Sequence, residues 1–172
     1  LHPKYSLWQP TLDLRDRRSV ICVCHNRIPL MTAMNHRNYS SVHFIGIGGT
    51  GMSAIARLLL ESGYIVTGSD RQFSSLAQSL QDAGVVVHVG HRAENVGRVD
   101  VVVRSSAVRD DNPEVQAALQ AGIPVLKRSD FLGEITSGKT CIAVAGSHGK
   151  TTTTAMIAWM LVSLGQDPSY LI

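Results

Sequence analysis

Apolar and polar positions follow two different periodicities between residues 42 and 164, one typical of strands and one typical of helices. Residues 42–47 form a mostly apolar run that ends among glycines, which is typical of a buried strand in a parallel sheet. Residues 52–60 carry apolar side chains at helical spacing, and Gly63 stands where such a helix would end. The same criteria predict further strands at residues 64–67, 85–89, 99–103, 123–126 and 140–145, and further helices at residues 75–83, 113–121, 129–135 and 151–164.

Strands that alternate with helices predict an α/β fold, with a parallel sheet joined by right-handed crossovers. We expect a Rossmann-like domain over residues 41–137, followed at residues 138–172 by the start of a second α/β unit. One strand and one helix cannot bury both faces of the strand. We therefore expect the sequence to be a fragment of a longer chain.

Residues 1–40 show no sustained period and contain several prolines. We interpret them as a disordered or non-native extension, with the folded domain starting near Met34. A targeting segment is the alternative. Asp13 and Asp16 do not suit an organelle transit peptide, because such peptides are poor in acidic residues.

Composition excludes several classes of protein. The net charge is +3, and no basic stripe with interleaved aromatics appears, so we expect no nucleic-acid partner. No apolar run approaches the roughly 20 residues of a membrane span, so we expect no membrane insertion. Three cysteines, with Cys22 and Cys24 too close for a zinc knuckle or a redox pair, suit the reducing cytoplasm. Cys141 lies in an apolar run and is predicted to be buried.

A first glycine loop lies between the first predicted strand and the first predicted helix. Gly46, Gly48 and Gly51 form the pattern G-x-G-x-x-G, which permits a tight turn and a close approach of the backbone to a phosphate. Asp70 follows the second strand, where an acidic residue meets a ribose hydroxyl in dinucleotide-binding folds. The pattern predicts a bound pyrophosphate but does not identify the nucleotide. An NAD site, or a turn that serves only packing, remains an alternative.

A second glycine loop, residues 146–152, joins the strand at 140–145 to the helix at 151–164. Its Gly-Lys-Thr ending matches the P-loop, although Val144 replaces the first glycine of G-x-x-x-x-G-K-[ST]. Its N–H groups would cradle phosphates, Lys150 would reach the outer phosphates, and Thr151 would bind Mg²⁺. The predicted ATP-binding residues are Gly146, Ser147, His148, Gly149, Lys150, Thr151 and Thr152. His148 either touches a ligand or only holds the loop.

The two loops, together with the segments between them, resemble the Mur ligases of peptidoglycan synthesis over residues 42–172. The segments that carry the resemblance are residues 43–53, 67–70, 90–91, 105–108, 112–115, 122–126 with Arg128, and 146–154. Ser147 stands where the family usually has threonine, which preserves a hydroxyl. Ser129 and Asp130 replace the commoner Ala-Glu.

The resemblance implies that the first domain binds UDP-N-acetylmuramate rather than NAD, and that the second loop begins a P-loop α/β ATP-binding domain. The residues implied for the UDP sugar are Gly48, Gly49, Thr50, Gly51, Met52 and Ser53 at the pyrophosphate, and Asp70, His91, Ser105 and Ser106 at the uridine side or the pocket wall. His91 and the two serines could instead cap turns. Arg128, which belongs to the matching segments, could serve the UDP-sugar site or form an ion pair between domains.

The implied enzyme is an ATP-dependent ligase that joins L-alanine to UDP-N-acetylmuramate. The muramate carboxylate attacks the γ-phosphate of ATP to give an acyl phosphate, from which the amine of L-alanine displaces phosphate. Lys150, Mg²⁺ and the loop N–H groups would stabilise negative charge in both steps, so Lys150 is the predicted catalytic residue. The family's remaining site residues lie beyond residue 172, so we expect this chain alone not to catalyse ligation. The alternatives are a relative that recycles whole peptides onto the same UDP sugar, and an NAD-binding module without ligase activity.

Overall fold

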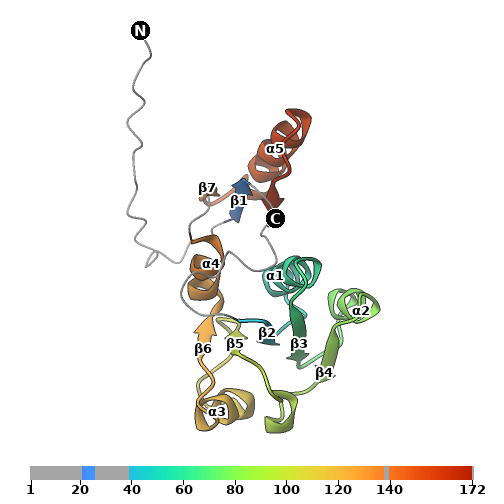
Figure 1. Cartoon of the computed structure of the whole chain (residues 1–172), viewed down its shortest axis with the longest axis vertical. Coiled ribbons are helices and arrows are strands. Elements are labelled where there is room, and N and C mark those ends of the chain that lie inside the picture. The colour runs from blue at the N-terminus through green and yellow to red at the C-terminus, as the bar shows by residue number, and fades with distance from the viewer. Residues whose placement is uncertain (1–20, 26–38, 138–139, 172) are drawn as a thin grey trace.

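The computed structural model describes residues 21–25, 39–137 and 140–171 (Figure 1). Its main sheet has five strands: β2 (Ser41–Ile45), β3 (Ile65–Asp70), β4 (Val86–Val89), β5 (Val101–Arg104) and β6 (Val125–Lys127). Their order is β4-β3-β2-β5-β6, and every neighbouring pair is parallel. The order reverses between β2 and β5, which is the switch point where doubly wound sheets bind ligands. The predicted Rossmann-like fold is confirmed.

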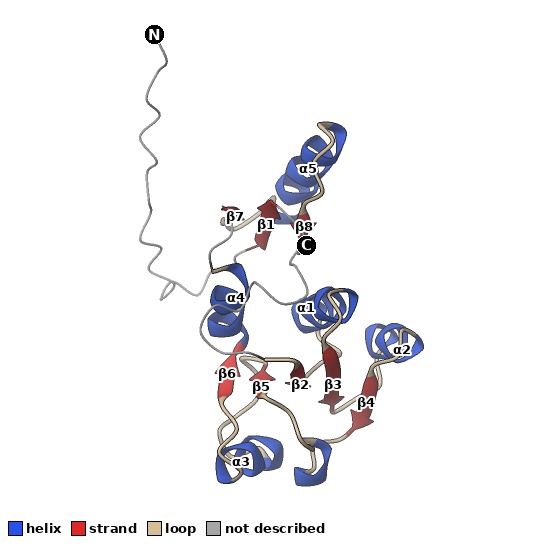
Figure 2. Cartoon of the chain, viewed as in Figure 1, coloured by secondary structure: helices blue, strands red, loops and turns tan. Residues whose placement is uncertain are grey.

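Helices cover both faces of this sheet (Figure 2). One face carries α1 (Thr50–Glu61), α2 (Ser75–Asp82) and α4 (Arg128–Thr136), whereas the other carries α3 (Pro113–Gln120) and the 3₁₀ helix η1 (Ala93–Asn95). Side chains alternate between the two faces along each strand. Phe44 packs on the α1 side and meets Phe131 of α4 edge-on, with ring centroids 6.1 Å apart. Its neighbour Ile45 packs on the α3 side, against Val115 and Ala118.

The observed bounds differ from the predicted ones by at most three residues, and the shifts have physical causes. β2 ends at Ile45 because Gly46 turns with a φ of 86°, and the Gly46 and Ile47 N–H groups then donate to the Ser69 carbonyl at 2.8 and 3.0 Å. β3 continues past the predicted end through Gly68. A Cβ there would lie 2.5 Å from Ile47 Cδ1, so only glycine permits the strand to pass so close to the loop.

The second sheet has three strands in the order β7-β1-β8. β1 (Ile21–His25) lies between β7 (Thr140–Val144) and β8 (Ser169–Tyr170) and runs antiparallel to both. α5 (Lys150–Ser163) follows β7, so the predicted strand, loop and helix are present. Within the described ranges, no helix combines the length and the apolar character that a membrane span requires.

Two expectations for this part of the chain differ from the structure. Residues 1–40 were expected to be a disordered or non-native extension. Within them Ile21–His25 forms β1, so this segment is not disordered, because backbone pairing with β7 and β8 needs no particular side-chain period. Residues 1–20 and 26–38 lie outside the described residues. Cys141 was predicted to be buried, yet it is exposed, because β7 is exposed along most of its length.

Asp100 ties together the starts of the two central strands, at the opposite end of the sheet from the glycine loop. Its Oδ2 accepts hydrogen bonds from the N–H groups of Ser40 and Ser41 at 2.7 and 2.8 Å, and from both serine hydroxyls at 2.9 Å. The backbone N–H of Ser40 makes the largest contribution, and together these bonds outweigh desolvation and lower the pKa of Asp100 to about 2. An ionised carboxylate therefore joins β2 to β5.

We predict that Asp100→Ala lowers the free energy of unfolding by about 1 kcal/mol, because charge-assisted hydrogen bonds are lost at a largely exposed site. Since the folded pKa lies below the ordinary value of 3.8, this contribution is present above about pH 4 and is lost as the pH falls toward 2. Urea titrations of the unaltered chain and of Asp100→Ala between pH 2 and 7 measure the difference in their free energies of unfolding. Asp82→Ala, which removes an exposed carboxylate that accepts a hydrogen bond from the Gln78 side chain, is the control. If the unaltered chain and Asp100→Ala differ in the free energy of unfolding by the same amount at every pH, the stabilising role of the ionised Asp100 carboxylate is contradicted.

Candidate functional site

The loops that follow the five parallel strands meet at one edge of the sheet, because the strands all run the same way. This edge carries the following residues: Gly46–Gly51 after β2, Asp70 at the end of β3, His91 after β4, Ser105 and Ser106 after β5, and Arg128 after β6. The residues predicted for the UDP sugar therefore come from four separate segments of sequence and gather at a single edge.

The glycine loop leaves two backbone donors at the start of α1. Gly49 caps the helix without a side chain, and its carbonyl accepts from the N–H groups of Met52 and Ser53 at 3.0 and 2.9 Å. The N–H groups of Thr50 and Gly51 precede the first bonded turn and are the ones a helix start offers to an anion. Met52 and Ser53 are buried, and the Ser53 hydroxyl donates to the Thr50 carbonyl at 3.0 Å.

Asp70 holds the glycine loop in place. Its Oδ2 accepts from the Gly48 N–H at 2.8 Å, and the Ser74 hydroxyl donates to the Gly48 carbonyl at 3.2 Å. A Cβ on Gly48 would lie 2.8 Å from Ser74 Oγ and 2.9 Å from Asp70 Oδ2, so the glycine is required for this contact. The other carboxylate oxygen accepts from the Gln72 N–H at 3.3 Å.

Arg128 lies directly across the start of α1. A Cβ on Gly51 would lie 2.0 Å from Arg128 Nη1 and 3.2 Å from Arg128 Cζ, so the guanidinium occupies the space that the glycine leaves open. Arg128 is exposed. A cation, two backbone N–H groups and the positive end of a helix dipole therefore converge at one point, which suits a phosphate.

A cavity of about 460 Å³ opens beside this point, at the ends of β5 and β6. Its lining residues are Arg104, Ser105, Ser106, Val108, Arg109, Asp110, Asp111 and Lys127. Ser105 joins the cavity to the glycine loop, because its Cβ lies 3.1 Å from the place of a Cβ on Gly46. The volume is in the range of small-molecule sites, which run from about 300 to 1,000 Å³.

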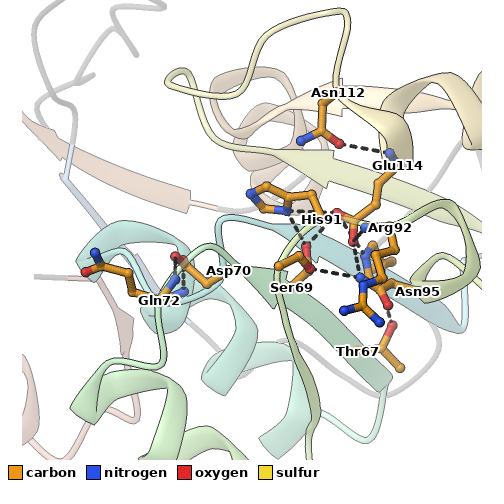
Figure 3. A network of polar contacts seen from close by, with 12 residues as sticks. Thr67, Ser69, Asp70, Gln72, His91, Arg92, Asn95, Asn112 and Glu114 are labelled. Carbon is orange, nitrogen blue, oxygen red and sulfur yellow. Dashed lines mark hydrogen bonds and ion pairs between the residues drawn. The ribbon is translucent and has the colours of Figure 1, made fainter.

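A buried polar network lies at the same edge, on the α3 side of the sheet (Figure 3). Glu114 is fully buried at its centre. Its Oε2 accepts from the Ser69 hydroxyl at 2.5 Å and lies 3.2 Å from His91 Nδ1, while its Oε1 accepts from Asn95 Nδ2 at 2.6 Å. His43 Nε2 lies 3.8 Å from Oε2.

Glu114 is ionised in this environment. Burial acts to raise its pKa, but the contacts with His43, Ser69 and Asn95 outweigh burial and lower the pKa to about 2. At 3.8 Å the His43 contact exceeds hydrogen-bond length, so its effect is electrostatic, whereas Ser69 and Asn95 bond directly. A buried carboxylate stays charged only when donors surround it, as they do here.

The second glycine loop sits between β7 and α5 with its lysine folded over it. Gly149 adopts a φ of 79° at the start of α5, a left-handed conformation that suits glycine. Lys150 Nζ donates to the Gly146 carbonyl at 2.7 Å and lies 3.4 Å from the Ser147 carbonyl. Ser147, His148, Thr151 and Thr152 are exposed around it. The ammonium therefore lies next to the N–H groups that would hold a phosphate.

Sequence reasoning missed the residues at the centre of the polar network. Glu114, His43 and Ser69 were placed only within the segments that carry the family resemblance, and Asn95 was given no role. One signal was present, since His43 interrupts an otherwise apolar buried run. A buried polar residue of that kind needs a partner, but the sequence did not show that the partner comes from α3.

Comparison with known proteins gives close matches. A family model described as "Mur ligase family, catalytic domain" matches residues 41–140. The UDP-N-acetylmuramate–L-alanine ligase of Chlorobium phaeobacteroides (strain BS1) is 59% identical over 136 residues, or 78% of this chain and 29% of that protein. The ligase of the same name from Psychrobacter sp. (strain PRwf-1) is 48% identical over 136 residues, or 79% of this chain and 29% of that protein. The chain thus spans less than a third of the length of these relatives.

Solved structures agree with the sequence matches. The UDP-N-acetylmuramate–alanine ligase of Thermotoga maritima superposes with a TM-score of 0.65 at 37% identity, over 72% of this chain and 29% of that chain. The Neisseria meningitides ligase for UDP-N-acetylmuramate and L-alanyl-γ-D-glutamyl-meso-diaminopimelate gives a TM-score of 0.63 at 30% identity, over 73% of this chain and 40% of that chain. The glycine loops, the order of the strands and these matches together show that the chain belongs to the Mur ligase family.

Proposed function

We propose that this chain supplies the UDP-sugar-binding domain, and the start of the ATP-binding domain, of a cytoplasmic ligase that joins L-alanine to UDP-N-acetylmuramate in peptidoglycan synthesis. The observation that carries the proposal is the anion site at the start of α1, where Arg128 lies across Gly51 beside a small-molecule cavity. The names of the relatives that are 48–59% identical support the choice of amino acid.

The pyrophosphate of the UDP sugar would bind at the first glycine loop. The N–H groups of Thr50 and Gly51 and the guanidinium of Arg128 converge there, and the adjacent cavity reaches Ser105 and Ser106. NAD fits this site less well, because Asp70 already accepts from Gly48 and Gln72. In dinucleotide-binding folds, the corresponding carboxylate binds a ribose hydroxyl.

ATP would bind at the second loop, with Mg²⁺ on the Thr151 hydroxyl. The bound metal ion would neutralise phosphate charge, as it does in other phosphoryl-transfer enzymes. The muramate carboxylate attacks the γ-phosphorus, which forms an acyl phosphate and releases ADP. The amine of L-alanine then attacks the acyl carbon, releasing phosphate and a proton as the amide forms. Lys150 would turn from the Gly146 carbonyl toward the phosphates and stabilise their charge in both steps.

A second candidate is the ligase that joins whole peptides to the same UDP sugar. It is favoured by the TM-score of 0.63 with the Neisseria meningitides ligase, close to the 0.65 found with the alanine ligase. Phosphate release by a full-length protein that contains this chain separates the two candidates. Release that depends on L-alanine supports our proposal, whereas release that depends only on the tripeptide supports the second candidate.

We predict that the 172-residue chain binds UDP-N-acetylmuramate, and that Arg128→Ala weakens binding about tenfold, because one charge-assisted contact with phosphate is lost. Isothermal titration calorimetry with UDP-N-acetylmuramate and with NADH measures both affinities. Arg98→Ala, which removes an exposed arginine near the opposite end of β5, is the charge-matched control. Tight binding of NADH with no response to the UDP sugar would overturn the proposal.

In a full-length ligase that contains this chain, we predict that Lys150→Ala abolishes phosphate release, by a factor of about 10³ or more, because charge on the transferred phosphoryl group loses its cation. A coupled phosphate assay at saturating substrates measures the rate. UDP-sugar affinity should stay unchanged, which shows that the first domain is intact. Turnover close to that of the unaltered enzyme would remove Lys150 from the mechanism.

A further inference from the structure

Glu114 is placed differently from an ordinary acidic residue at a helix start. The start of α3 is already capped, because Asn112 Oδ1 accepts from the Glu114 N–H at 2.9 Å and Pro113 occupies the first turn. The Glu114 side chain instead turns inward and is fully buried. It contacts Ser69 at the end of β3 and His91 in the loop after β4. The carboxylate therefore does something other than cap α3.

The hydrogen-bond network fixes which nitrogen of His91 carries a proton. His91 Nδ1 lies 3.0 Å from Ser69 Oγ and 3.2 Å from Glu114 Oε2. The single hydroxyl proton of Ser69 is donated to Glu114 at 2.5 Å, and an ionised carboxylate has no proton to give. Both neighbours of Nδ1 are therefore acceptors, so Nδ1 must be the donor. In the neutral imidazole, Nε2 is then left as an acceptor.

The acceptor nitrogen lies on the edge of the His91 ring that is turned away from Ser69 and Glu114. His91 is held by its Nδ1 edge, and the opposite edge of the ring points away from the network (Figure 3). The His91 side chain is 14% exposed, so part of the ring reaches the protein surface although Nδ1 contacts the buried Glu114 carboxylate. Asn95 reinforces the arrangement, because its Nδ2 also donates to the Gly90 carbonyl at 3.0 Å, immediately before His91.

From this geometry we propose that Glu114 is a positioning residue for the nucleotide site, which holds His91 in the Nδ1–H tautomer so that Nε2 accepts a hydrogen bond from the nucleoside of the UDP sugar. The inference rests on the proposed function, since the ligand is the one proposed there. Two groups of uridine can supply the donor: the N3–H of uracil and the 2′-hydroxyl of ribose. Cytosine has no proton at N3, and a 2′-deoxynucleotide lacks the hydroxyl, so analogues can tell the two donors apart.

Nitrogen NMR tests the first half of the proposal on the unaltered 172-residue chain. We expect the ¹⁵N shifts of His91 at neutral pH to show a protonated Nδ1 and an unprotonated Nε2. In Glu114→Gln, the amide N–H₂ group competes with Ser69 and Asn95 as a donor, so we expect the Nε2–H form to appear. A role confined to packing would leave the tautomer unchanged. An Nε2–H form in the unaltered chain would overturn the proposal without any variant.

Calorimetry with UDP as the probe tests the second half. We expect Glu114→Gln to weaken UDP binding about tenfold, and His91→Ala to do the same, since each removes the oriented acceptor. In the double variant the losses should not add, because Glu114 acts through His91. Glu94→Gln, the same change at an exposed position in η1, should bind UDP normally. Additive losses, or unchanged binding in a folded Glu114→Gln, would overturn the proposal.

Two nucleotide analogues locate the donor. If uracil N3–H is the donor, CDP binds the unaltered chain about tenfold more weakly than UDP does, and His91→Ala removes that preference. If the ribose hydroxyl is the donor, 2′-deoxy-UDP binds the unaltered chain about tenfold more weakly than UDP does, and His91→Ala removes that preference. Equal discrimination in the unaltered chain and in His91→Ala, for both analogues, would overturn the inference. Failure of the unaltered chain to bind UDP would instead overturn the proposed function.

Discussion

A parallel sheet must deliver the carboxyl ends of all its strands to one edge, and the chemistry of this protein depends on that constraint. Residues as distant in sequence as Gly51 and Arg128 become neighbours because each follows a strand of the same sheet. The centre of that edge is where the order of strands reverses, between β2 and β5. Crossover helices leave in opposite directions there, so a ligand can reach backbone N–H groups that helices cover elsewhere.

The two ends of the sheet use buried and exposed carboxylates for different purposes. At the amino end, Asp100 accepts from two serines and joins β2 to β5. At the carboxyl end, Glu114 joins β3 to the loop after β4, but one of its partners is a histidine with a second polar atom. A carboxylate bonded to hydroxyls and backbone can only hold strands together. A carboxylate bonded to an imidazole also determines what the far side of the ring offers to a ligand.

Much of the fold could be predicted from the sequence, because each strand and helix has its own local period and its own terminators. The helix predicted at residues 113–121 begins at Pro113 in the structure, where Asn112 caps α3. The parallel order followed from the alternation of strands and helices. β1 could not be predicted, since its pairing with β7 joins residues more than 100 positions apart. The three-residue η1 is too short to show a helical period.

The candidate site was predictable only where a backbone requirement restricts the choice of residue. Gly46, Gly48 and Gly51 stood out because a turn or a close approach excludes a Cβ, and the structure identifies Ser105, Asp70 and Arg128 as the groups that approach. Glu114 did not stand out, because a glutamate in the first turn of a helix is expected for reasons of dipole alone. Its function depends on which way the side chain turns, and that is decided by partners on β2, β3 and the loop after β4.

The two glycine loops share one arrangement, which in the proposed function would serve two ligands. Each loop joins a strand to a helix start and places one long cation beside it, Arg128 at the first loop and Lys150 at the second. The cations differ in a way that suits the two tasks. A guanidinium is a planar fork that fixes a pyrophosphate in one orientation, whereas an ammonium is a compact point charge on a flexible stem. Lys150 bonds to its own loop at Gly146 and, in the proposed function, would follow a phosphoryl group as it transfers. Arg128 comes from a different strand and lies against Gly51, so it suits a group that is held and does not react.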